Sequence, residues 1–238
     1  MPTLLITGGS RGIGRAIVEL FSKEGYNVAF TYKSSHARAM ELADATGALA
    51  ICADSADEQA VRLAVSKTVE KFGSVDCLIN NSAVSSFSVF TDISLEQWRE
   101  MMAVNLDGAF LYCREVIPDM LKRKQGRIIN ISSMWGIVGS SCEVHYSTSK
   151  AALIGMTKAL AKELGPSGIT VNAIAPGVID TEMNASLSDV DLATLKDETP
   201  LMRIGSAAEV ARVALFLASE GASFVTGDVL NVSGGYVI

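Results

Sequence analysis

Seven short apolar segments alternate along the chain with longer segments of helical periodicity. The apolar segments are rich in Val, Ile and Leu and lack the strict alternation of a half-exposed strand, as is typical of parallel strands covered on both faces. They read TLLITG, NVAFTY, ALAICA, VDCLIN, GRIINIS, ITVNAIAP and DVLNVSGG. Strands that alternate with helices predict an α/β fold of the Rossmann type, a doubly wound parallel sheet of about seven strands with helices on both faces.

The segments between these strands contain five predicted helices, at residues 14–23, 58–71, 96–123, 146–164 and 207–218. Residues 178–206 show no clear pattern, and a long segment after a strand end is often a substrate lid. No linker, repeat or low-complexity segment interrupts the chain. We therefore expect residues 1–238 to form one NAD(P)-binding domain.

Composition argues against several classes of protein. The formal net charge is −6 and the chain has no strongly basic tract, so nucleic-acid binding is not predicted. The N-terminal segment has no charged leader or long apolar run, so neither secretion nor a membrane span is expected. The four cysteines form no C-x-x-C pair and there are only two histidines, which favours a reduced cytoplasmic protein without a structural metal.

A glycine-rich segment, TGGSRGIG, follows the first predicted strand and opens the first predicted helix. Gly8, Gly12 and Gly14 are spaced G-x-x-x-G-x-G rather than the G-x-G-x-x-G of many dinucleotide-binding folds. Glycine lets the backbone turn tightly and approach a pyrophosphate at a helix N-terminus. The segment therefore predicts a dinucleotide site, and a simple tight connection is the alternative.

The end of the second predicted strand indicates which dinucleotide is bound. A carboxylate at this position would bind the ribose of NAD, but the sequence has Lys33 followed by two serines, and Arg11 lies within the glycine turn. Two cations without a carboxylate suit a 2′-phosphate, and the alternative is that both are ordinary surface charges. We expect NADPH, or NADP+ in the reverse direction, as the cofactor.

Tyr146 and Lys150 lie one helical turn apart in the segment VHYSTSKAALIG, so they share a helix face. A lysine charge held beside a phenol makes the phenolate easier to form. This arrangement would serve an enzyme that transfers protons, although the same spacing also occurs by chance on helix surfaces.

Several motifs follow one another in an order that covers essentially the whole chain. They are TGGSRGIG, NNSA, Asn105 in AVNLDG, ISS ending at Ser133, YSTSK and PGVIDT. This order resembles the classical short-chain dehydrogenase/reductase family. The resemblance implies that Tyr146 donates a proton to a carbonyl oxygen and that Lys150 lowers the pKa of Tyr146 and binds the nicotinamide ribose. Ser133 would donate a hydrogen bond to the substrate oxygen, and Asn105 would hold a water in a proton relay behind Lys150.

The resemblance also implies contacts with the cofactor. Asp54 would face the adenine, Asn81 and Ala83 the adenosine ribose, and Ile179 and Thr181 the carboxamide. The full set of expected cofactor residues is Gly8, Ser10, Arg11, Gly12, Ile13, Gly14, Lys33, Asp54, Asn81, Ala83, Tyr146, Lys150, Pro176, Gly177, Ile179 and Thr181. Ala83 replaces the last glycine of the family's usual NNAG motif, and we expect this to have a modest effect on affinity.

The reaction implied is NADPH-dependent reduction of a ketone to a secondary alcohol. Arg11 and the segments RIINISS and VTGDVLNVSGGY resemble 3-oxoacyl-[acyl-carrier-protein] reductases, which act in fatty acid biosynthesis on a β-keto thioester carried by an acidic protein. Lys122, Arg123 and Lys124 would meet such a carrier. A second basic position that these reductases often use is Ser167 here, which weakens this interpretation.

The segment SSMWGIVGSSCEVHYSTSKAA is more similar to bacterial reductases that act on the 5-aminopentanone group attached to a lysine of elongation factor P. Glu143 would pair with the amine of that substrate, and the alternative is a solvent-exposed loop acid. A non-catalytic NADPH-binding sensor on the same fold is a further alternative, but the presence of Ser133, Tyr146 and Lys150 together argues against it. Because the family is commonly tetrameric, we expect the chain to form a homo-oligomer. We expect this to be a homotetramer whose interfaces contain residues 96–123, residues 146–164 and the C-terminal strand.

Overall fold

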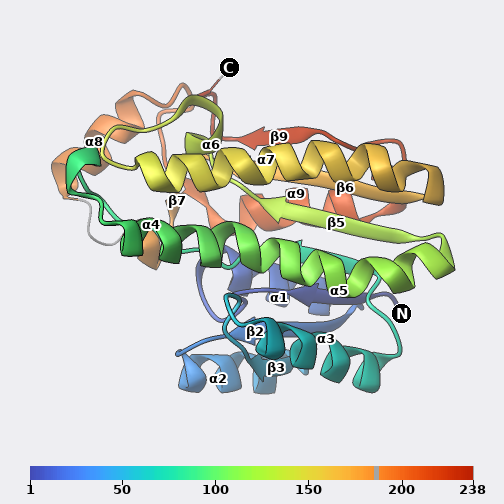
Figure 1. The fold of residues 1–238 in the computed structure, drawn as a ribbon. Helices are drawn as coiled ribbons and strands as arrows, with labels where there is room; N and C mark the ends of the chain where they lie inside the picture. The colour runs from blue at the N-terminus through green and yellow to red at the C-terminus, as the bar shows by residue number, and fades with distance from the viewer. Residues whose placement is uncertain (185–187, 238) are drawn as a thin grey trace.

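The computed structural model describes residues 1–184 and 188–237, and its central element is a parallel sheet of seven strands (Figure 1). The strand order is β3-β2-β1-β4-β5-β6-β9, and each neighbouring pair is parallel. The strands are β1 (Thr3–Ile6), β2 (Asn27–Tyr32), β3 (Leu49–Cys52), β4 (Cys77–Asn80), β5 (Gly126–Ile131), β6 (Ile169–Pro176) and β9 (Val229–Val232). The predicted doubly wound sheet of about seven strands is confirmed.

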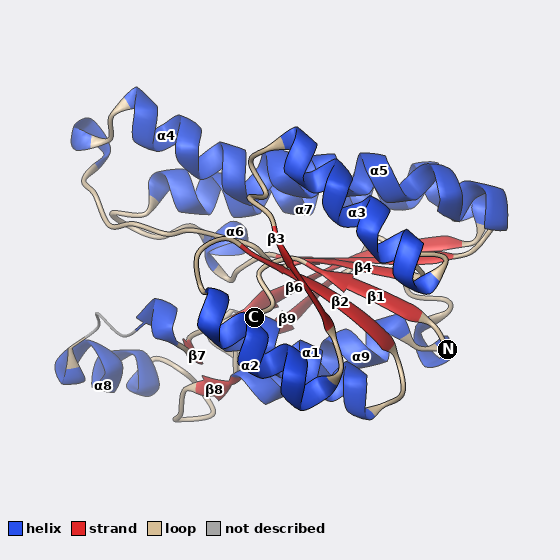
Figure 2. Ribbon diagram, turned by 90° about the horizontal axis from the view of Figure 1, so that it is seen from below, coloured by secondary structure: helices blue, strands red, loops and turns tan. Residues whose placement is uncertain are grey.

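Helices cover both faces of the sheet, as Figure 2 shows. One layer contains α1 (Gly12–Lys23), α2 (His36–Thr46) and α9 (Ala207–Ala218), and the other contains α3 (Glu58–Phe72), α5 (Gly108–Arg123) and α7 (Val144–Leu164). The sequence of strand β1 is apolar throughout because both of its faces are covered. Leu4 and Ile6 pack with the first layer and Leu5 with the second, and all three are fully buried.

The helix expected at residues 96–123 is divided into three parts. Helix α4 (Leu95–Met102) passes into a π-helical turn, η2 (Ala103–Asp107), and then into α5. The side chain of Asn105 stabilises this turn by bonding the backbone of Val84: its Oδ1 accepts the N–H at 2.8 Å and its Nδ2 donates to the carbonyl at 2.9 Å. A π turn often marks a functional site, and this one directs Asn105 into the protein.

The region without a clear sequence pattern, residues 178–206, contains short elements. They are β7 (Ile179–Asp180), η4 (Glu182–Asn184), α8 (Asp189–Asp197) and β8 (Gly205–Ser206), and β7 pairs with β8 in parallel. Residues 185–187 of the predicted lid lie outside the described residues. Further short elements are α6 (Trp135–Val138), η1 (Phe90–Asp92), η3 (Gly165–Ser167) and η5 (Glu220–Ala222).

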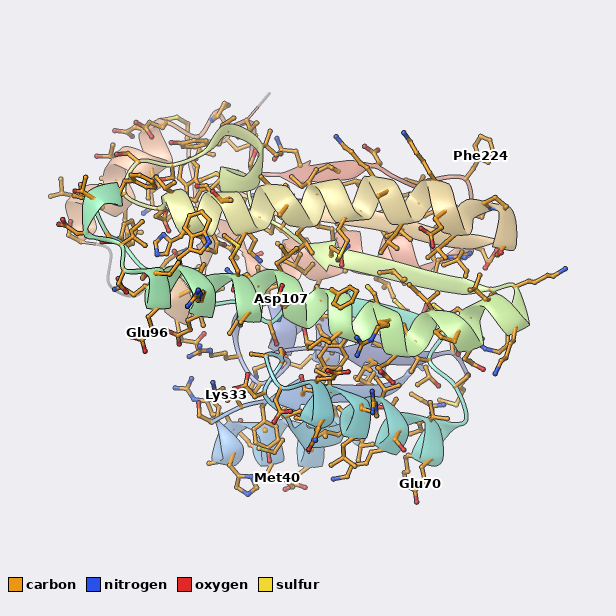
Figure 3. The ribbon with its side chains drawn as sticks, in the orientation of Figure 1. Lys33, Met40, Glu70, Glu96, Asp107 and Phe224 are labelled. Atoms are coloured by element: carbon orange, nitrogen blue, oxygen red, sulfur yellow. The ribbon has the colours of Figure 1, made fainter. Side chains whose placement is uncertain are left out.

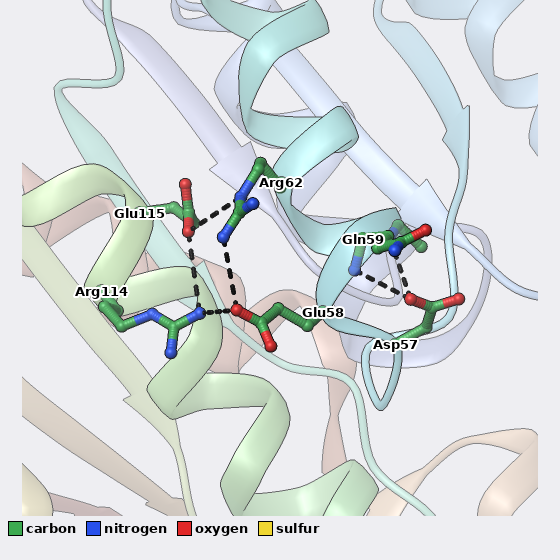
Figure 4. Close-up of polar contacts among 7 residues, drawn as sticks. Asp57, Glu58, Gln59, Arg62, Arg114 and Glu115 are labelled. Carbon is green, nitrogen blue, oxygen red and sulfur yellow. Dashed lines mark hydrogen bonds and ion pairs between the residues drawn. The ribbon is translucent and has the colours of Figure 1, made fainter.

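A cluster of ion pairs joins helices α3 and α5 at the surface (Figure 4). Glu58 pairs with Arg62 at 3.3 Å and with Arg114, and Glu115 pairs with Arg62 at 3.6 Å. Asp57 begins helix α3 by accepting two backbone N–H groups of its first turn. None of the described helices combines the length and the apolar character that a membrane span requires.

Candidate active site

Two cavities lie at the carboxyl ends of the strands. One, of about 300 Å³, lies over the ends of β1, β2 and β3, and the other, of about 380 Å³, lies over the ends of β5 and β6. Ile13, Asn81, Ala83 and Thr181 line both, so the two cavities form one continuous cleft. In a doubly wound sheet this is the edge where ligands bind, at the point where the strand order reverses between β1 and β4. We call the two parts the smaller and the larger cavity.

The glycine turn forms one wall of the smaller cavity. Gly8 and Gly12 have φ values of 67° and 52°, which few residues with a side chain adopt. At Gly14 a Cβ atom would lie 2.2 Å from the carbonyl oxygen of Gly8, so only glycine allows helix α1 to start this close to strand β1. The backbone therefore leaves the N-terminus of α1 open to a phosphate group.

The smaller cavity also contains the residues expected to recognise the adenosine half of the cofactor. Lys33 and Asp54 form an ion pair across it, with 2.6 Å between Nζ and Oδ2. Burial raises the pKa of the Asp54 carboxyl, but the hydrogen bonds from Lys33 and from the backbone N–H of Ala56, together with the charge of Lys33, lower it by more, so the pKa lies below its ordinary value. Arg11 lines the same cavity and has no ion-pair partner among the described residues. Figure 3 shows Lys33 at the end of the molecule that carries helix α4.

Every residue predicted to contact the cofactor lines one of the two cavities. Those of the smaller cavity are Gly8, Ser10, Arg11, Gly12, Ile13, Gly14, Lys33, Asp54, Asn81, Ala83 and Thr181. Those of the larger cavity are Ile13, Asn81, Ala83, Tyr146, Lys150, Pro176, Gly177, Ile179 and Thr181. The structure thus brings together residues that the sequence distributes from position 8 to position 181.

Thr7 is a structural part of the site that the sequence analysis did not single out. Its Oγ1 accepts the backbone N–H groups of Asn81 at 2.9 Å and of Ser82 at 2.8 Å. The Nδ2 of Asn81 donates in return to the carbonyl oxygens of Thr7 and Gly8, both at 3.0 Å. These bonds join the ends of strands β1 and β4. The partners are more than 70 positions apart, so no local pattern indicated the contact.

Ser133, Tyr146 and Lys150 all line the larger cavity, and the last two lie on helix α7. Ser133 follows strand β5, and its Oγ accepts the backbone N–H of Trp135 at 3.1 Å, which leaves its own proton free to donate. Ser132 has a different role, because its hydroxyl donates to the backbone carbonyl of Lys150 at 2.9 Å. Of the two serines, Ser133 is the one available to a substrate.

Burial controls the acidity of the two proton-bearing side chains. It raises the pKa of Tyr146 to about 12; the nearby Ser133 hydroxyl lowers it and the charge of Glu143 raises it further. Burial also lowers the pKa of Lys150 to about 8. The ammonium of Lys150 lies 5.7 Å from the Tyr146 ring centre and donates to the carbonyl of Ile131 at 2.8 Å. Burial is thus the largest influence on the pKa of Tyr146 in this structure, and the expected lowering of that pKa by Lys150 stays a prediction.

Asn105 is buried behind the larger cavity and does not line it. Besides its two bonds to Val84, its Nδ2 donates to Ser149 Oγ at 3.1 Å, and Ser149 lies on helix α7 beside Lys150. The side chain thus joins the π turn η2 to the helix that carries Tyr146 and Lys150. Its role in holding a relay water stays a prediction.

Glu143 precedes helix α7 and lines the larger cavity, with only 6% of its surface exposed. The alternative that it is a solvent-exposed loop acid is therefore wrong. Burial raises the pKa of its carboxyl, and the nearby Ser140 hydroxyl opposes this rise.

The basic run Lys122, Arg123 and Lys124 lies away from the cleft. It ends helix α5 just before strand β5 begins, whereas Ser133 follows the end of that strand, so the two lie at opposite edges of the sheet (Figure 1). Arg123 already pairs with Asp76 at 2.6 Å and Asp119 at 2.7 Å. A carrier bound to this run would therefore sit far from the cleft of the same chain.

The chain is similar to known proteins over nearly its whole length. Residues 8–237 match a family model described as enoyl-(acyl carrier protein) reductase. The 3-oxoacyl-[acyl-carrier-protein] reductase of Aquifex aeolicus is 43% identical over 97% of this chain and 95% of its own length, and that of Staphylococcus aureus is 38% identical over 97% and 96%.

Solved structures give the same result. The crystal structure of a 3-oxoacyl-[acyl-carrier protein] reductase from Brucella melitensis matches with a TM-score of 0.94 and 36% identity, covering 100% of this chain and 92% of that one. A mutant short-chain dehydrogenase/reductase of Serratia marcescens matches with a TM-score of 0.93 and 38% identity, covering 99% and 97%. The chain therefore belongs to the short-chain dehydrogenase/reductase family and is an oxidoreductase of the type that interconverts carbonyl and alcohol groups.

Proposed function

We propose that the chain reduces a 3-oxoacyl thioester, presented by an acyl carrier protein, to the secondary alcohol with NADPH as the hydride donor. The observation that carries this proposal is the convergence of Ser133, Tyr146 and Lys150 in the larger cavity, next to a smaller cavity that contains the glycine turn and two cations. A binding module would have no use for a protonated phenol, a free hydroxyl and a buried ammonium group around one point.

The residues of the larger cavity suit the reduction of a carbonyl. The hydroxyls of Ser133 and Tyr146 can both donate to a carbonyl oxygen, where negative charge develops as the carbon is reduced. The raised pKa of Tyr146 keeps its proton in place at neutral pH, and the alkoxide that forms is a much stronger base than a phenolate. Tyr146 therefore acts as the general acid, and Lys150 supplies positive charge as the proton leaves.

The smaller cavity fits a dinucleotide with a 2′-phosphate. The space in front of Gly8, Gly12 and Gly14 allows a pyrophosphate to approach the backbone. Arg11 and Lys33 would hold the additional phosphate, and Lys33 would exchange its bond to Asp54 for this contact. When bound, the nicotinamide supplies the hydride, and the protein supplies position and charge.

The substrate part of the proposal is supported by the relatives from Aquifex aeolicus and Staphylococcus aureus, which are 3-oxoacyl-[acyl-carrier-protein] reductases. Reduction of a 5-aminopentanone group on elongation factor P stays a prediction from the sequence. We also propose that the protein acts as a homotetramer, which would bring the exposed Phe110 on helix α5 into an interface.

The proposed function is tested by following NADPH oxidation optically with an acetoacetyl thioester, both free and attached to acyl carrier protein, with NADH in parallel. We expect turnover with NADPH, faster for the carrier-bound substrate. The Tyr146→Phe variant should bind NADPH as the wild type does and lose at least about 100-fold in kcat. Tyr26→Phe, which removes a hydroxyl outside the cleft, is the matched control. NADPH binding without turnover of any ketone would instead support a sensor.

A further inference from the structure

We propose that His145 is a positioning residue for the reduction of the ketone. Its hydrogen bond to Ser86 holds residues 81–89 against helix α7, and this keeps Phe87 at the wall of the larger cavity. The inference rests on the proposed function and identifies a pair of residues on which binding of the substrate depends.

The segment that contains Ser86, residues 81–89, connects strand β4 to η1 and forms no helix or strand. A segment of this kind is held in place by individual bonds rather than by a regular ladder of backbone bonds. The side chain of Asn105 bonds the backbone of Val84 near the start of the segment. Near its end, the backbone N–H of Ser88 donates to a carbonyl of the segment before helix α7, at 2.8 Å.

The middle of this segment has a single anchor. Ser86 Oγ lies 2.7 Å from Nε2 of His145, a residue of which only 1% is exposed. In the part of the chain that the structure describes, no other hydrogen bond or ion pair joins residues 85–87 to another segment. The position of these residues relative to helix α7 therefore depends on this bond.

The surroundings of His145 determine the direction of the bond. Its Nδ1 is buried and has no hydrogen-bond partner among the described residues. A neutral imidazole carries one proton, and a proton on Nδ1 would be a buried donor without an acceptor, which is costly. We therefore place the proton on Nε2, which donates it to Ser86 Oγ. Burial also lowers the pKa of His145, so the ring is neutral at pH 7.

The bond connects a wall of the larger cavity to the helix that carries the proton donor. Ser85 and Phe87, which flank Ser86, line this cavity. Tyr146, which follows His145 on helix α7, lines it as well. Phe87 is 64% exposed, so packing against the protein is not enough to hold its ring in place. Contact between Phe87 and an apolar part of the thioester therefore depends on where the bond places the backbone of residues 85–87.

The test compares the wild type with variants of both partners. Ser86→Ala and His145→Phe each remove the bond, and phenylalanine keeps an aromatic ring in the buried position. His145→Gln restores a donor near the position of Nε2. Ser88→Ala is the control, because the Ser88 hydroxyl donates within the segment, to the carbonyl of Val89 at 3.3 Å. The measurements are kcat and KM for an acetoacetyl thioester, the dissociation constant of NADPH, and hydrogen exchange of residues 81–89 by mass spectrometry.

We expect Ser86→Ala and His145→Phe to raise KM about threefold to tenfold and to change kcat by less than about twofold, because the reacting groups are unchanged. The dissociation constant of NADPH should stay unchanged, and hydrogen exchange of residues 81–89 should become faster. The double variant should be no worse than either single variant, since both remove the same bond. His145→Gln and Ser88→Ala should resemble the wild type.

Three results would overturn the inference: additive losses in the double variant, equal losses in His145→Gln and His145→Phe, or unchanged hydrogen exchange of residues 81–89. A joint fall in kcat and in NADPH affinity would show a general structural role and would overturn it as well. Failure of the proposed function is a separate result. If the wild type does not turn over the thioester, the proposed substrate is wrong, and hydrogen exchange still decides whether His145 holds the segment.

Discussion

The buried ammonium group of Lys150 is an unusual feature at the scale of single residues. Only 2% of the residue is exposed, and within residues 1–184 and 188–237 its charged group has one hydrogen-bond acceptor, the carbonyl of Ile131. Burial lowers the pKa of Lys150 from 10.5 to about 8. A group whose pKa is lower in the folded than in the unfolded chain binds its proton more tightly when unfolded. The charged side chain therefore costs stability, fully so below about pH 8.

This cost predicts that Lys150 makes the free energy of unfolding depend on pH. As the pH rises from about 8 towards 10.5, the penalty fades, so the wild type gains stability that Lys150→Met cannot gain. Between roughly pH 7 and pH 10, the free energy of unfolding of the wild type should rise by about 2 kcal/mol relative to Lys150→Met. Urea unfolding of both proteins across this range measures the difference. A difference independent of pH would mean that Lys150 titrates normally in the folded chain.

Local sequence order indicated most of the residues that line the cleft. Ser133, Tyr146 and Lys150 belong to short motifs next to strand and helix ends, so once the sheet forms, their positions in the cleft follow. Glu143 and Thr7 are different. The burial of Glu143 and the two hydrogen bonds that Thr7 accepts depend on segments that are distant in the sequence. The acidity of Tyr146 was also not predictable from its spacing to Lys150, because desolvation depends on the complete cavity.

At the scale of secondary-structure elements, the site depends on how strands β1 and β4 end together. Thr7 and the segment that begins at Asn81 form this junction, and Asn81 lines both cavities. Thr7 is 2% exposed, so bulk water cannot replace its hydroxyl as the acceptor of these two backbone N–H groups. The hydroxyl therefore stabilises the fold and positions the wall between the cavities.

Thr7→Val tests this junction, since valine has the shape of threonine without the acceptor. Two N–H groups lose their partner, and we expect the free energy of unfolding to fall by about 2 kcal/mol and the affinity for NADPH to fall several-fold. Denaturant unfolding and fluorescence titration with NADPH measure the two effects. Thr170→Val, at a buried threonine of strand β6, is the control and should leave NADPH affinity unchanged. Unchanged NADPH affinity in Thr7→Val would show that the wall does not depend on this bond.

The elements themselves were predictable to different degrees. The seven strands have continuous apolar sequences because helices cover both faces, and that pattern is visible in the sequence. Helix α2 was not predicted, because it buries only Ala39 and Leu42 and its other residues give a weak pattern. The π turn between α4 and α5 was also not visible, because it is held by Asn105 and the distant backbone of Val84.

At the scale of the whole molecule, the C-terminal segment returns to the cleft and connects two of its walls. The ring of Tyr236 packs edge-on against Trp135 of helix α6, with 5.5 Å between ring centres. Its hydroxyl donates to Glu198 at the end of helix α8, at 2.7 Å. Trp135 and Leu195 of helix α8 line the larger cavity. We propose on this basis that the chain forms one domain, in which its last residues help to shape the substrate end of the cleft.

The residue that makes both contacts allows a test of this arrangement. Tyr236→Ala removes the ring that packs on Trp135 and the hydroxyl that holds Glu198, so both walls of the larger cavity lose a support. We expect KM for the ketone to rise several-fold, while the dissociation constant of NADPH stays unchanged. Among the described residues, the ring and hydroxyl of Tyr236 contact Trp135 and Glu198, and neither of these residues lines the smaller cavity. Tyr236→Phe keeps the ring and separates its packing from the hydrogen bond. A parallel loss of NADPH affinity in Tyr236→Ala would show that the C-terminal segment stabilises the domain as a whole rather than the substrate end of the cleft.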